Sequence, residues 1–404
     1  MIVSSLAAAA LYLGPSLLPA LPPAAPPFPV EPAPPRPAAA VDASLLHRPG
    51  TQVRLPPGVA RPPVLSARSW LVADARSGAV LAAHDAHKRL PPASTLKVLF
   101  ALAALPGLSP ERPHTVSRHE LTGIGDGSSL VGIKEEITYR VADLWRGVFL
   151  SSGNDAVRVL AGLNGGWAAT VREMQATAEA LGARDTRVVS PDGYDAPGQV
   201  SSAYDLAVFA RAGLRDPDFA RYCATPYAKF PAGSWSYGIR NTNRLLTGDD
   251  GVARYPGILG VKNGYTSGAG HTLIAAARRD GRTLVVTVMN PRSGGAYAVY
   301  EEARKLLDWG FAAAPRAHPV GSLLPPAKRR PDASTAPVAA GAPASAPASA
   351  PAAPKAPAQA QAQAQAPAGD DGPHLFLPAT FVISACVAAA TLWWVRRRVD
   401  TPLE

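Results

Sequence analysis

The chain has 404 residues, of which 43 are prolines, and it carries a formal net charge of +10. Most prolines lie near the two ends, whereas the stretch from Arg61 to Ala314 has an ordinary globular composition and, at roughly 250 residues, is long enough for one large domain. The positive charge suits an anionic polymer or a membrane face, or simply a soluble basic surface, but no Lys/Arg cluster interleaved with aromatics occurs in the domain, so we expect no nucleic acid partner.

Residues 1–26 are uncharged, apolar and rich in small residues, as in the hydrophobic part of a secretory signal peptide. They lack the usual positive n-region, so an uncleaved N-terminal anchor or a wrongly chosen start codon remains an alternative. Residues 27–63 are dense in proline and are predicted to be extended or disordered. The folded domain is therefore expected to occupy residues 64–314.

The domain is predicted to begin with two short strands, at 70–73 and 79–82, on either side of a Gly-containing turn. After a stop at Pro91 and Pro92, a strongly apolar helix is expected from residue 94 to residue 105. The first candidate catalytic residues lie at the start of this helix.

Ser94 and Lys97 are three residues apart, a spacing that places both side chains on one face of a helix. A serine hydroxyl is a good nucleophile only when a base takes its proton, and a lysine can be that base when burial or a nearby cation such as Lys262 lowers its pKa. Free N–H groups at the helix start would stabilise an oxyanion. The alternative is an N-cap serine and a surface lysine, but the apolar run Val98–Leu102 favours a partly buried Lys97.

A second group, Ser152-Gly153-Asn154, lies in a break between two predicted helices. We expect the Ser152 hydroxyl to pass a proton to a leaving amine, and Asn154 to hold Lys97 and the substrate backbone by hydrogen bonds. Taken alone, these residues are equally well interpreted as a helix N-cap assisted by Asp155.

Further helices are predicted at 167–181, 202–214 and 297–311, and strands at 272–277 and 283–288 on either side of a hairpin turn. Strands thus come early and late in the domain, with helices between them. This order predicts an α/β protein of the α+β type, with an antiparallel sheet built from both ends of the domain and an inserted all-helical part.

The third group, Lys262-Asn263-Gly264, opens a predicted strand. Gly264 lets a substrate lie against the strand edge, where backbone groups can pair with a peptide. Lys262 offers a charge for a carboxylate, and Asn263 offers an amide donor. Alone the tripeptide is more typical of a surface turn; all three groups together indicate acyl transfer through a serine ester.

The C-terminal region is predicted to tether the domain to a membrane. Residues 315–373 consist mostly of Pro, Ala and Gln and are expected to be a disordered linker. Residues 375–395 are uncharged and long enough to cross a bilayer, and three arginines follow at once. We therefore expect a single transmembrane helix at 375–395, a cytoplasmic tail at 396–404 and an extracytoplasmic catalytic domain.

Neither the cysteines nor the histidines indicate a disulfide or a metal site. Cys223 lies in the domain and Cys386 in the apolar C-terminal stretch, so the two are not expected to pair. The eight histidines show no metal-ligand spacing.

With its three groups in this order, the chain resembles serine-type D-alanyl-D-alanine carboxypeptidases, which are low-molecular-mass penicillin-binding proteins. The resemblance extends from about Ser69 to Phe311, and the groups match the SxxK, SxN and KTG motifs of that family. Other matching stretches are Leu150–Ala156, Ser190–Gly193, Ser202–Leu206 and Gly264–Gly270.

The resemblance implies the transpeptidase fold shared by penicillin-binding proteins and β-lactamases. It implies that Ser94 attacks the carbonyl between two D-alanines of a peptidoglycan stem peptide, with Lys97 as the base, Ser152 as a proton relay and Lys262 as the ligand of the terminal carboxylate. The backbone N–H groups of Ser94 and Tyr265 would form the oxyanion hole. The other residues expected to contact the substrate are Asn154, Asn263, Gly264, Tyr265 and Thr266. Neither a metal nor a cofactor is implied, and β-lactams are expected to acylate Ser94.

Two alternatives stay open. Asn263 stands where the family has threonine, which is the one feature that favours a non-catalytic homologue that binds the cell wall. A β-lactamase would need a glutamate to activate the deacylating water, usually in a loop after the second motif, whereas Glu173 and Glu179 lie in a predicted helix.

Overall fold

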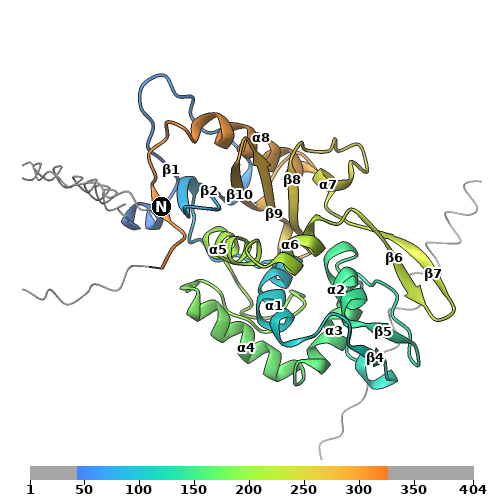
Figure 1. The fold of residues 1–404 in the computed structure, drawn as a ribbon. Coiled ribbons are helices and arrows are strands. Elements are labelled where there is room, and N and C mark those ends of the chain that lie inside the picture. Colours follow the sequence, from blue (N-terminus) through green and yellow to red (C-terminus); the bar gives the residue numbers. More distant parts are fainter. Residues whose placement is uncertain (1–42, 326–404) are drawn as a thin grey trace, which may run out of the picture. The chain divides into compact units, whose positions relative to one another are not determined.

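A seven-stranded antiparallel sheet forms the centre of the protein (Figure 1). The structure, a computed structural model, describes residues 43–325. The strands follow the order β1-β3-β2-β10-β9-β8, and β11 also pairs with β3, beside β1. The strands of this sheet are β1 (Thr51–Val53), β2 (Ala67–Asp74), β3 (Ala79–His84), β8 (Ile258–Thr266), β9 (Gly270–Arg279), β10 (Arg282–Pro291) and β11 (Gly321–Ser322). The predicted sheet built from both ends of the domain is therefore confirmed.

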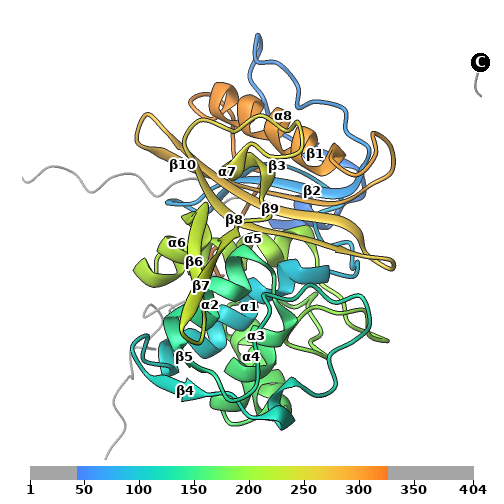
Figure 2. The same ribbon diagram turned by 90° about the vertical axis from the view of Figure 1, so that its right-hand side faces the viewer.

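Helices cover both faces of this sheet, which explains why its strands are apolar on both sides (Figure 2). Helix α8 (Ala298–Ala313) packs on one face, where its Leu306 and Leu307 join a buried cluster with residues of β2, β9 and β10. Helices α1 (Lys97–Ala104) and α5 (Ala203–Gly213) lie against the other face.

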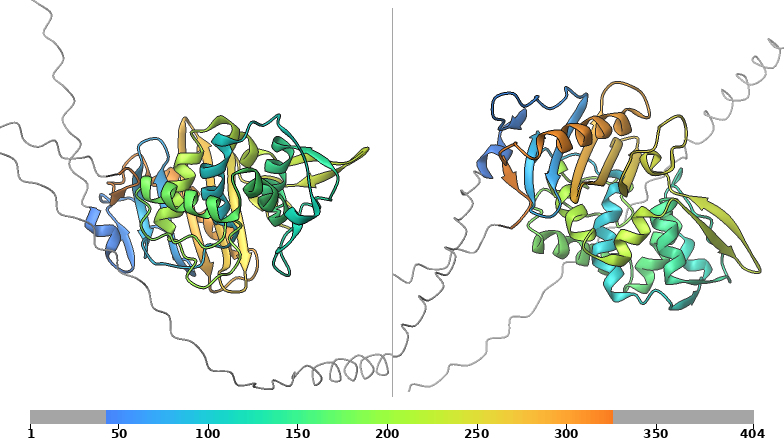
Figure 3. Two further views of the ribbon diagram at one scale, coloured as in Figure 1. Left: turned by 90° about the horizontal axis from the view of Figure 1, so that it is seen from below. Right: turned by 45° about the horizontal axis from the view of Figure 1, so that its top comes forward.

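The helical part lies below the sheet in Figure 2, and the predicted helix–break–helix is present in it. The remaining helices are α2 (Val141–Leu150), α3 (Asn154–Leu163), α4 (Trp167–Ala180), α6 (Pro217–Ala224) and α7 (Arg244–Thr247). The 3₁₀ turns are η1 (Ala43–His47), η2 (Ala93–Leu96), η3 (Leu105–Gly107) and η4 (Arg118–Leu121). Two small antiparallel pairs complete the fold, β4 (Pro113–Thr115) with β5 (Thr138–Arg140), and β6 (Tyr227–Ala232) with β7 (Trp235–Arg240). The second pair is a hairpin that projects from the body of the protein (Figure 3).

Helix α6 was not predicted, although its start carries a clear signal in the sequence. Asp216 caps the helix by accepting hydrogen bonds from the backbone N–H groups of Asp218 and Phe219, and Pro217 occupies the first helical position. The hairpin β6–β7 was missed because its alternation is weak and Pro231 interrupts it.

Folded structure extends beyond the expected boundaries of 64 and 314. Within the segment 27–63, predicted to be disordered, residues 43–63 are ordered: β1 pairs with the outer edge of β3, and Leu46 is buried in the core. Beyond residue 314, β11 pairs with the same edge, and Leu323 is buried. These segments cover an otherwise open sheet edge, which composition alone does not reveal.

Among residues 43–325, no helix combines the length and the apolar character needed to span a bilayer. The expected N-terminal segment 1–26, the transmembrane helix 375–395 and the tail 396–404 lie outside the described residues, as do Cys386 and most of the linker. Cys223 is a buried free thiol.

Candidate active site

Ser94 and Lys97 meet as their spacing predicts, although the turn that carries Ser94 is the 3₁₀ turn η2 rather than an α-helix. The Nζ atom of Lys97 donates to the Ser94 Oγ at 2.8 Å, to the Asn154 Oδ1 at 2.7 Å and to the backbone oxygen of Asp192 at 2.5 Å. Lys97 is only 1% exposed. The alternative of an N-cap serine with a surface lysine is therefore wrong.

Burial gives Lys97 the properties of a base. Loss of hydration is the largest effect and lowers the pKa of its amine to about 8, while the negative charges of Asp192 and Asp155 act in the opposite direction. A neutral amine is thus accessible near neutral pH, at hydrogen-bond distance from the hydroxyl that it would deprotonate.

The break between α2 and α3 places Asn154 within hydrogen-bond distance of Lys97. While its Oδ1 accepts from the lysine, its Nδ2 donates to the Ser128 Oγ at 3.0 Å, so both ends of the amide are held. Ser152 lies in the same break with φ of +57°, and its buried hydroxyl has no hydrogen-bond partner among the described residues. The role of Ser152 as a proton relay stays a prediction.

Asp155 fixes the loop that faces this break. Its carboxylate accepts hydrogen bonds from the backbone N–H groups of Val131, Gly132 and Ile133, at 2.8 to 3.0 Å. These three N–H donors help to satisfy the buried carboxylate and tie the segment Val131–Ile133 to the start of α3. Asp155 also lies in the first turn of α3 and accepts from the backbone N–H of Ala156 at 2.9 Å, so the expected assistance at this helix start is present beside the contacts to the distant segment.

The third group lies on β8, directly beside η2. A β-carbon at Gly264 would lie 2.7 Å from the backbone nitrogen of Ser94, so only glycine allows this approach. Gly264 therefore lets β8 pack against the turn that carries the nucleophile. From the sequence, this glycine was expected only to give a substrate access to the strand edge.

Lys262 is as buried as Lys97, and its Nζ donates to the backbone oxygen of Asn263 at 2.8 Å. Burial, reinforced by repulsion from Lys97, lowers the pKa of Lys262 well below its usual value. The Asn263 Oδ1 accepts from the Thr242 Oγ1 at 2.9 Å, which leaves the amide NH₂ group as the part of this side chain that can donate to a ligand.

The last two predicted residues lie at the exposed end of β8. Tyr265 is 62% exposed, and its ring packs against His271 in a tilted arrangement with 4.6 Å between the ring centroids. The Thr266 hydroxyl donates to Asp195 at 2.7 Å, and the backbone N–H of Gly268 donates to the same carboxylate. Thr266 thus ties the β8–β9 turn to the loop between α4 and α5. Contacts of Tyr265 and Thr266 with a substrate stay predictions.

The same loop supplies a site residue that was not predicted from the sequence. This residue is Asp192, whose backbone oxygen accepts the hydrogen bond from Lys97. Gly193 makes the approach possible, because it has φ of +78° and a β-carbon there would lie 2.1 Å from the Ala93 oxygen. The stretch Ser190–Gly193 matched the family, and a glycine after a turn aspartate was the available signal.

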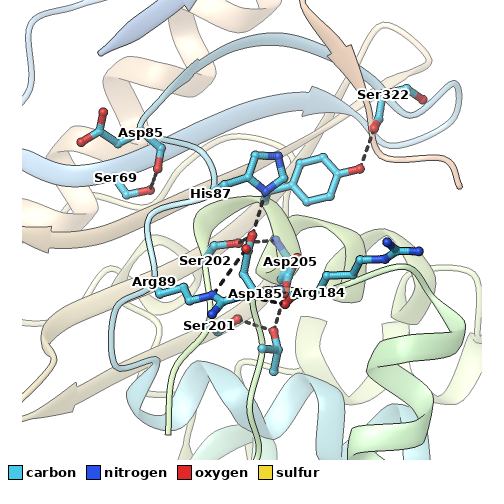
Figure 4. A network of polar contacts seen from close by, with 12 residues as sticks. Ser69, Asp85, His87, Arg89, Arg184, Asp185, Ser201, Ser202, Asp205 and Ser322 are labelled. Atoms are coloured by element: carbon cyan, nitrogen blue, oxygen red, sulfur yellow. Dashed lines mark hydrogen bonds and ion pairs between the residues drawn. The ribbon is translucent and has the colours of Figure 1, made fainter. Parts of the chain in front are cut away.

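A polar network anchors the two ends of the loop (Figure 4). Asp185 bonds the His87 Nδ1 at 2.7 Å and accepts from the Ser202 hydroxyl at 2.8 Å. Asp205 accepts from the Thr186 hydroxyl at 2.7 Å. Burial raises the pKa of Asp205 to about 6.

The arrangement supports nucleophilic acyl transfer. It has a hydroxyl bonded to a buried amine, a second buried amine and a free amide donor. Within residues 43–325, no group of three or more His, Cys, Asp or Glu side chains is placed to hold a metal ion.

Comparisons with known proteins agree with this chemistry. The profile of the D-alanyl-D-alanine carboxypeptidase family matches residues 58–293. The D-alanyl-D-alanine carboxypeptidase DacB2 of Mycobacterium tuberculosis is 41% identical over 264 residues, which are 64% of this chain and 86% of the relative. DacD of Escherichia coli is 36% identical over 265 residues, which are 62% of this chain and 64% of that protein.

Solved structures share the fold. The crystal structure of a D-alanyl-D-alanine carboxypeptidase from Mycobacterium tuberculosis has a TM-score of 0.60 and 40% identity, covering 66% of this chain and 99% of that one. A Streptomyces DD-transpeptidase has a TM-score of 0.57 and 26% identity, covering 63% of this chain and 100% of that one.

Proposed function

Since the chain belongs to the D-alanyl-D-alanine carboxypeptidase family, we propose that it removes the terminal D-alanine from peptidoglycan stem peptides through an acyl-enzyme on Ser94. It is a serine-type carboxypeptidase with the fold of the penicillin-binding proteins. The single observation that carries the mechanism is the 2.8 Å hydrogen bond from a fully buried Lys97 to the Ser94 hydroxyl.

In the acylation step, the neutral amine of Lys97 takes the hydroxyl proton as the Ser94 oxygen forms a bond to the carbonyl carbon of the penultimate D-alanine. The N–H groups of Ser94 and Tyr265 stabilise the resulting oxyanion. The C–N bond then breaks, and the leaving amine of D-alanine receives the proton from Lys97, directly or through Ser152. Water hydrolyses the ester and restores the hydroxyl.

The substrate carboxylate also controls the proton balance of the site. Two buried amines so close to each other resist double protonation. A carboxylate bound beside Lys262 and the Asn263 amide favours the ammonium form of Lys262, and repulsion between the amines then favours Lys97 as the neutral partner of the pair.

We place this activity outside the cell, on the wall side of a membrane. Support comes from the uncharged segment 375–395 and the arginines that follow it, from the apolar residues 1–26, and from the linker that would give the domain reach. The partners are then the stem peptide as substrate, β-lactams as inhibitors, and the membrane through the C-terminal span.

The alternatives from the sequence gain no support from the geometry. Glu173 and Glu179 both lie on α4, where Glu173 accepts a hydrogen bond from Asn164, so neither is in the loop position expected of a β-lactamase glutamate. The Asn263 NH₂ group can still donate a hydrogen bond to a substrate carboxylate, because only its Oδ1 is engaged by Thr242. A non-catalytic homologue would not need this donor.

Release of D-alanine from a peptide ending in D-Ala-D-Ala tests the proposal. Wild type should release one D-alanine per peptide and leave an L-Ala-L-Ala control intact, and Ser94→Ala should release none. Absence of release by the folded wild type would contradict the proposed activity.

A further inference from the structure

A second pocket, of about 540 Å³, lies between α2, α6 and the hairpin β6–β7. None of its lining residues belongs to the three groups of the active site. Its walls bring together cationic side chains from separate elements: Arg140 from the end of β5, Arg146 from the middle of α2, Arg221 from α6 and Lys229 from β6. The only acidic residue that lines it is Asp143, and Asp218, outside the lining, pairs with Arg221 at 2.5 Å.

Asp143 holds two of the arginines in position. It is nearly fully buried, and its carboxylate pairs with Arg146 and, at 3.2 Å, with Arg140. One negative charge therefore orients two guanidinium groups, and each has more N–H donors than Asp143 can use. The side chain of Arg146 is 27% exposed, so it remains accessible from the pocket.

The clearest sign of a ligand is the hydroxyl of Tyr222. Tyr222 is 2% exposed and lines the pocket, yet its hydroxyl has no hydrogen-bond partner among the described residues. Burial raises the pKa of this hydroxyl, while the nearby charges of Arg221 and Arg146 lower it and those of Asp218 and Asp143 raise it. The Arg221 guanidinium lies 5.0 Å from the centre of the Tyr222 ring. A buried donor without an acceptor, next to cations, fits an anionic oxygen as the missing partner.

The hairpin adds a surface that suits the remainder of a larger ligand. Cross-strand partners Lys229 with Gly238 and Tyr227 with Arg240 lie on one face of the hairpin, because strand residues alternate between faces. Tyr227 is exposed, and a neighbouring groove lined by Tyr227, Lys229 and Arg240 continues from the pocket. Among the described residues, Lys229 forms no ion pair.

We propose that this pocket binds a phosphate ester, with the phosphate oxygens between Arg146, Arg221, Lys229 and the Tyr222 hydroxyl and the esterified organic group along Tyr227. Guanidinium groups converging from separate elements match the several oxygens of a phosphate, and the volume exceeds that of the phosphate alone. The ester comes either from a soluble or polymeric glycerol or sugar phosphate, or from a phospholipid headgroup. Bound there, it would hold the enzyme on an anionic layer while Ser94 remains free.

The test uses the full chain, with glycerol 1-phosphate titrated by isothermal calorimetry at constant ionic strength. The double variant Arg221→Gln with Lys229→Gln should weaken binding at least about tenfold, since two charge-assisted hydrogen bonds are lost. Arg118→Gln with Lys305→Gln is the matched control: it removes one arginine and one lysine, both exposed, from other surfaces and should leave binding unchanged. Tyr222→Phe, which removes one oxygen, should weaken binding several-fold.

Vesicles separate the two sources of the ester. Stronger binding to phosphatidylglycerol than to phosphatidylcholine vesicles, lost in the Arg221/Lys229 variant but not in the control, assigns the site to a lipid headgroup; saturable binding of glycerol 1-phosphate alone assigns it to the soluble ester. Acylation by benzylpenicillin should be normal in every variant, which shows that each is folded. No saturable binding of either probe, or equal losses in both double variants, overturns the proposal and leaves the carboxypeptidase activity untouched.

Discussion

Lys97 and Lys262 are both buried and share one polar site, and the charge of Lys97 lowers the pKa of Lys262. No ion pair to a carboxylate compensates either amine among the described residues, and the strongest contacts of both are to amide, hydroxyl or backbone oxygens. The site therefore favours neutral amines, and it has a place for one negative charge that only a ligand can supply.

The first prediction concerns the pH dependence of acylation. The pKa of Lys97 lies near 8, below its usual value, so the fraction of neutral base increases with pH and saturates above that value. The second-order rate constant for benzylpenicillin should increase about tenfold per unit between pH 5 and 7 and level off above pH 8. Stopped-flow acylation measures this profile. A rate that does not change between pH 5 and 8 would exclude Lys97 as the base, and Lys97→Arg should show no measurable acylation.

The second prediction concerns the hydrogen bond from Thr242 to Asn263. Thr242→Val frees the amide to rotate, so its NH₂ group no longer faces the carboxylate. Without this orientation, the substrate should lose about 1 kcal/mol of binding free energy. KM for a D-Ala-D-Ala peptide should then rise roughly fivefold, with little change in kcat. Thr138→Val, which removes an exposed hydroxyl pair with Thr115, is the control and should leave KM unchanged. An unchanged KM in Thr242→Val would mean that Asn263 does not bind the substrate.

The third prediction separates close packing at Gly193 from the ordinary cost of a left-handed residue. Gly193→Ala should destabilise the protein and abolish most acylation, because the new β-carbon would lie 2.1 Å from the Ala93 oxygen and push the Ser94 turn away. Gly281→Ala is the matched control, with φ of +75° and nothing within 4 Å of the new atom. It should cost about 1 kcal/mol and leave acylation intact. Equal acylation by the two variants would contradict the positioning role of Gly193.

The fourth prediction concerns Asp205, whose pKa is raised to about 6 by burial. The folded state binds this proton more tightly than the unfolded state does, so the stabilisation is complete below about pH 4 and is lost as the pH rises through 6. The free energy of unfolding of the wild type, minus that of Asp205→Asn, should fall by about 2 to 3 kcal/mol between pH 4 and 7. Urea unfolding at both pH values measures this difference. A constant difference would show that Asp205 does not titrate in this range.

Sequence reasoning recovered the elements with strong local signals. The strands of the central sheet are continuous apolar runs bounded by turns, and the helices of the insertion show clear periodicity. Edge elements such as β1 and β11 could not be predicted, since β3 alone gives them a partner. The hairpin β6–β7 was not predicted because its alternation is weak. Helix α6 was not predicted because the signal at Asp216 and Pro217 was overlooked.

The candidate site shows the same division. The three motifs identified the side chains that meet at Ser94, because side-chain chemistry is visible in the sequence. The Asp192 oxygen and the Thr242 hydroxyl could not be assigned, since a backbone acceptor has no residue signature and a partner from another element depends on the tertiary fold. The packing role of Gly264 could not be predicted, because its close neighbour, Ser94, is 170 positions away in the sequence, and its role in substrate access stays a prediction.

Esterification of Ser94 is the central step of the proposed mechanism. Mass spectrometry of the intact protein and of its peptides, after incubation with benzylpenicillin, tests this step most directly. We predict one penicilloyl group per chain, on the peptide that contains Ser94, and none in Ser94→Ala. A folded wild type that remains unmodified, or an adduct that persists in Ser94→Ala, would contradict the account.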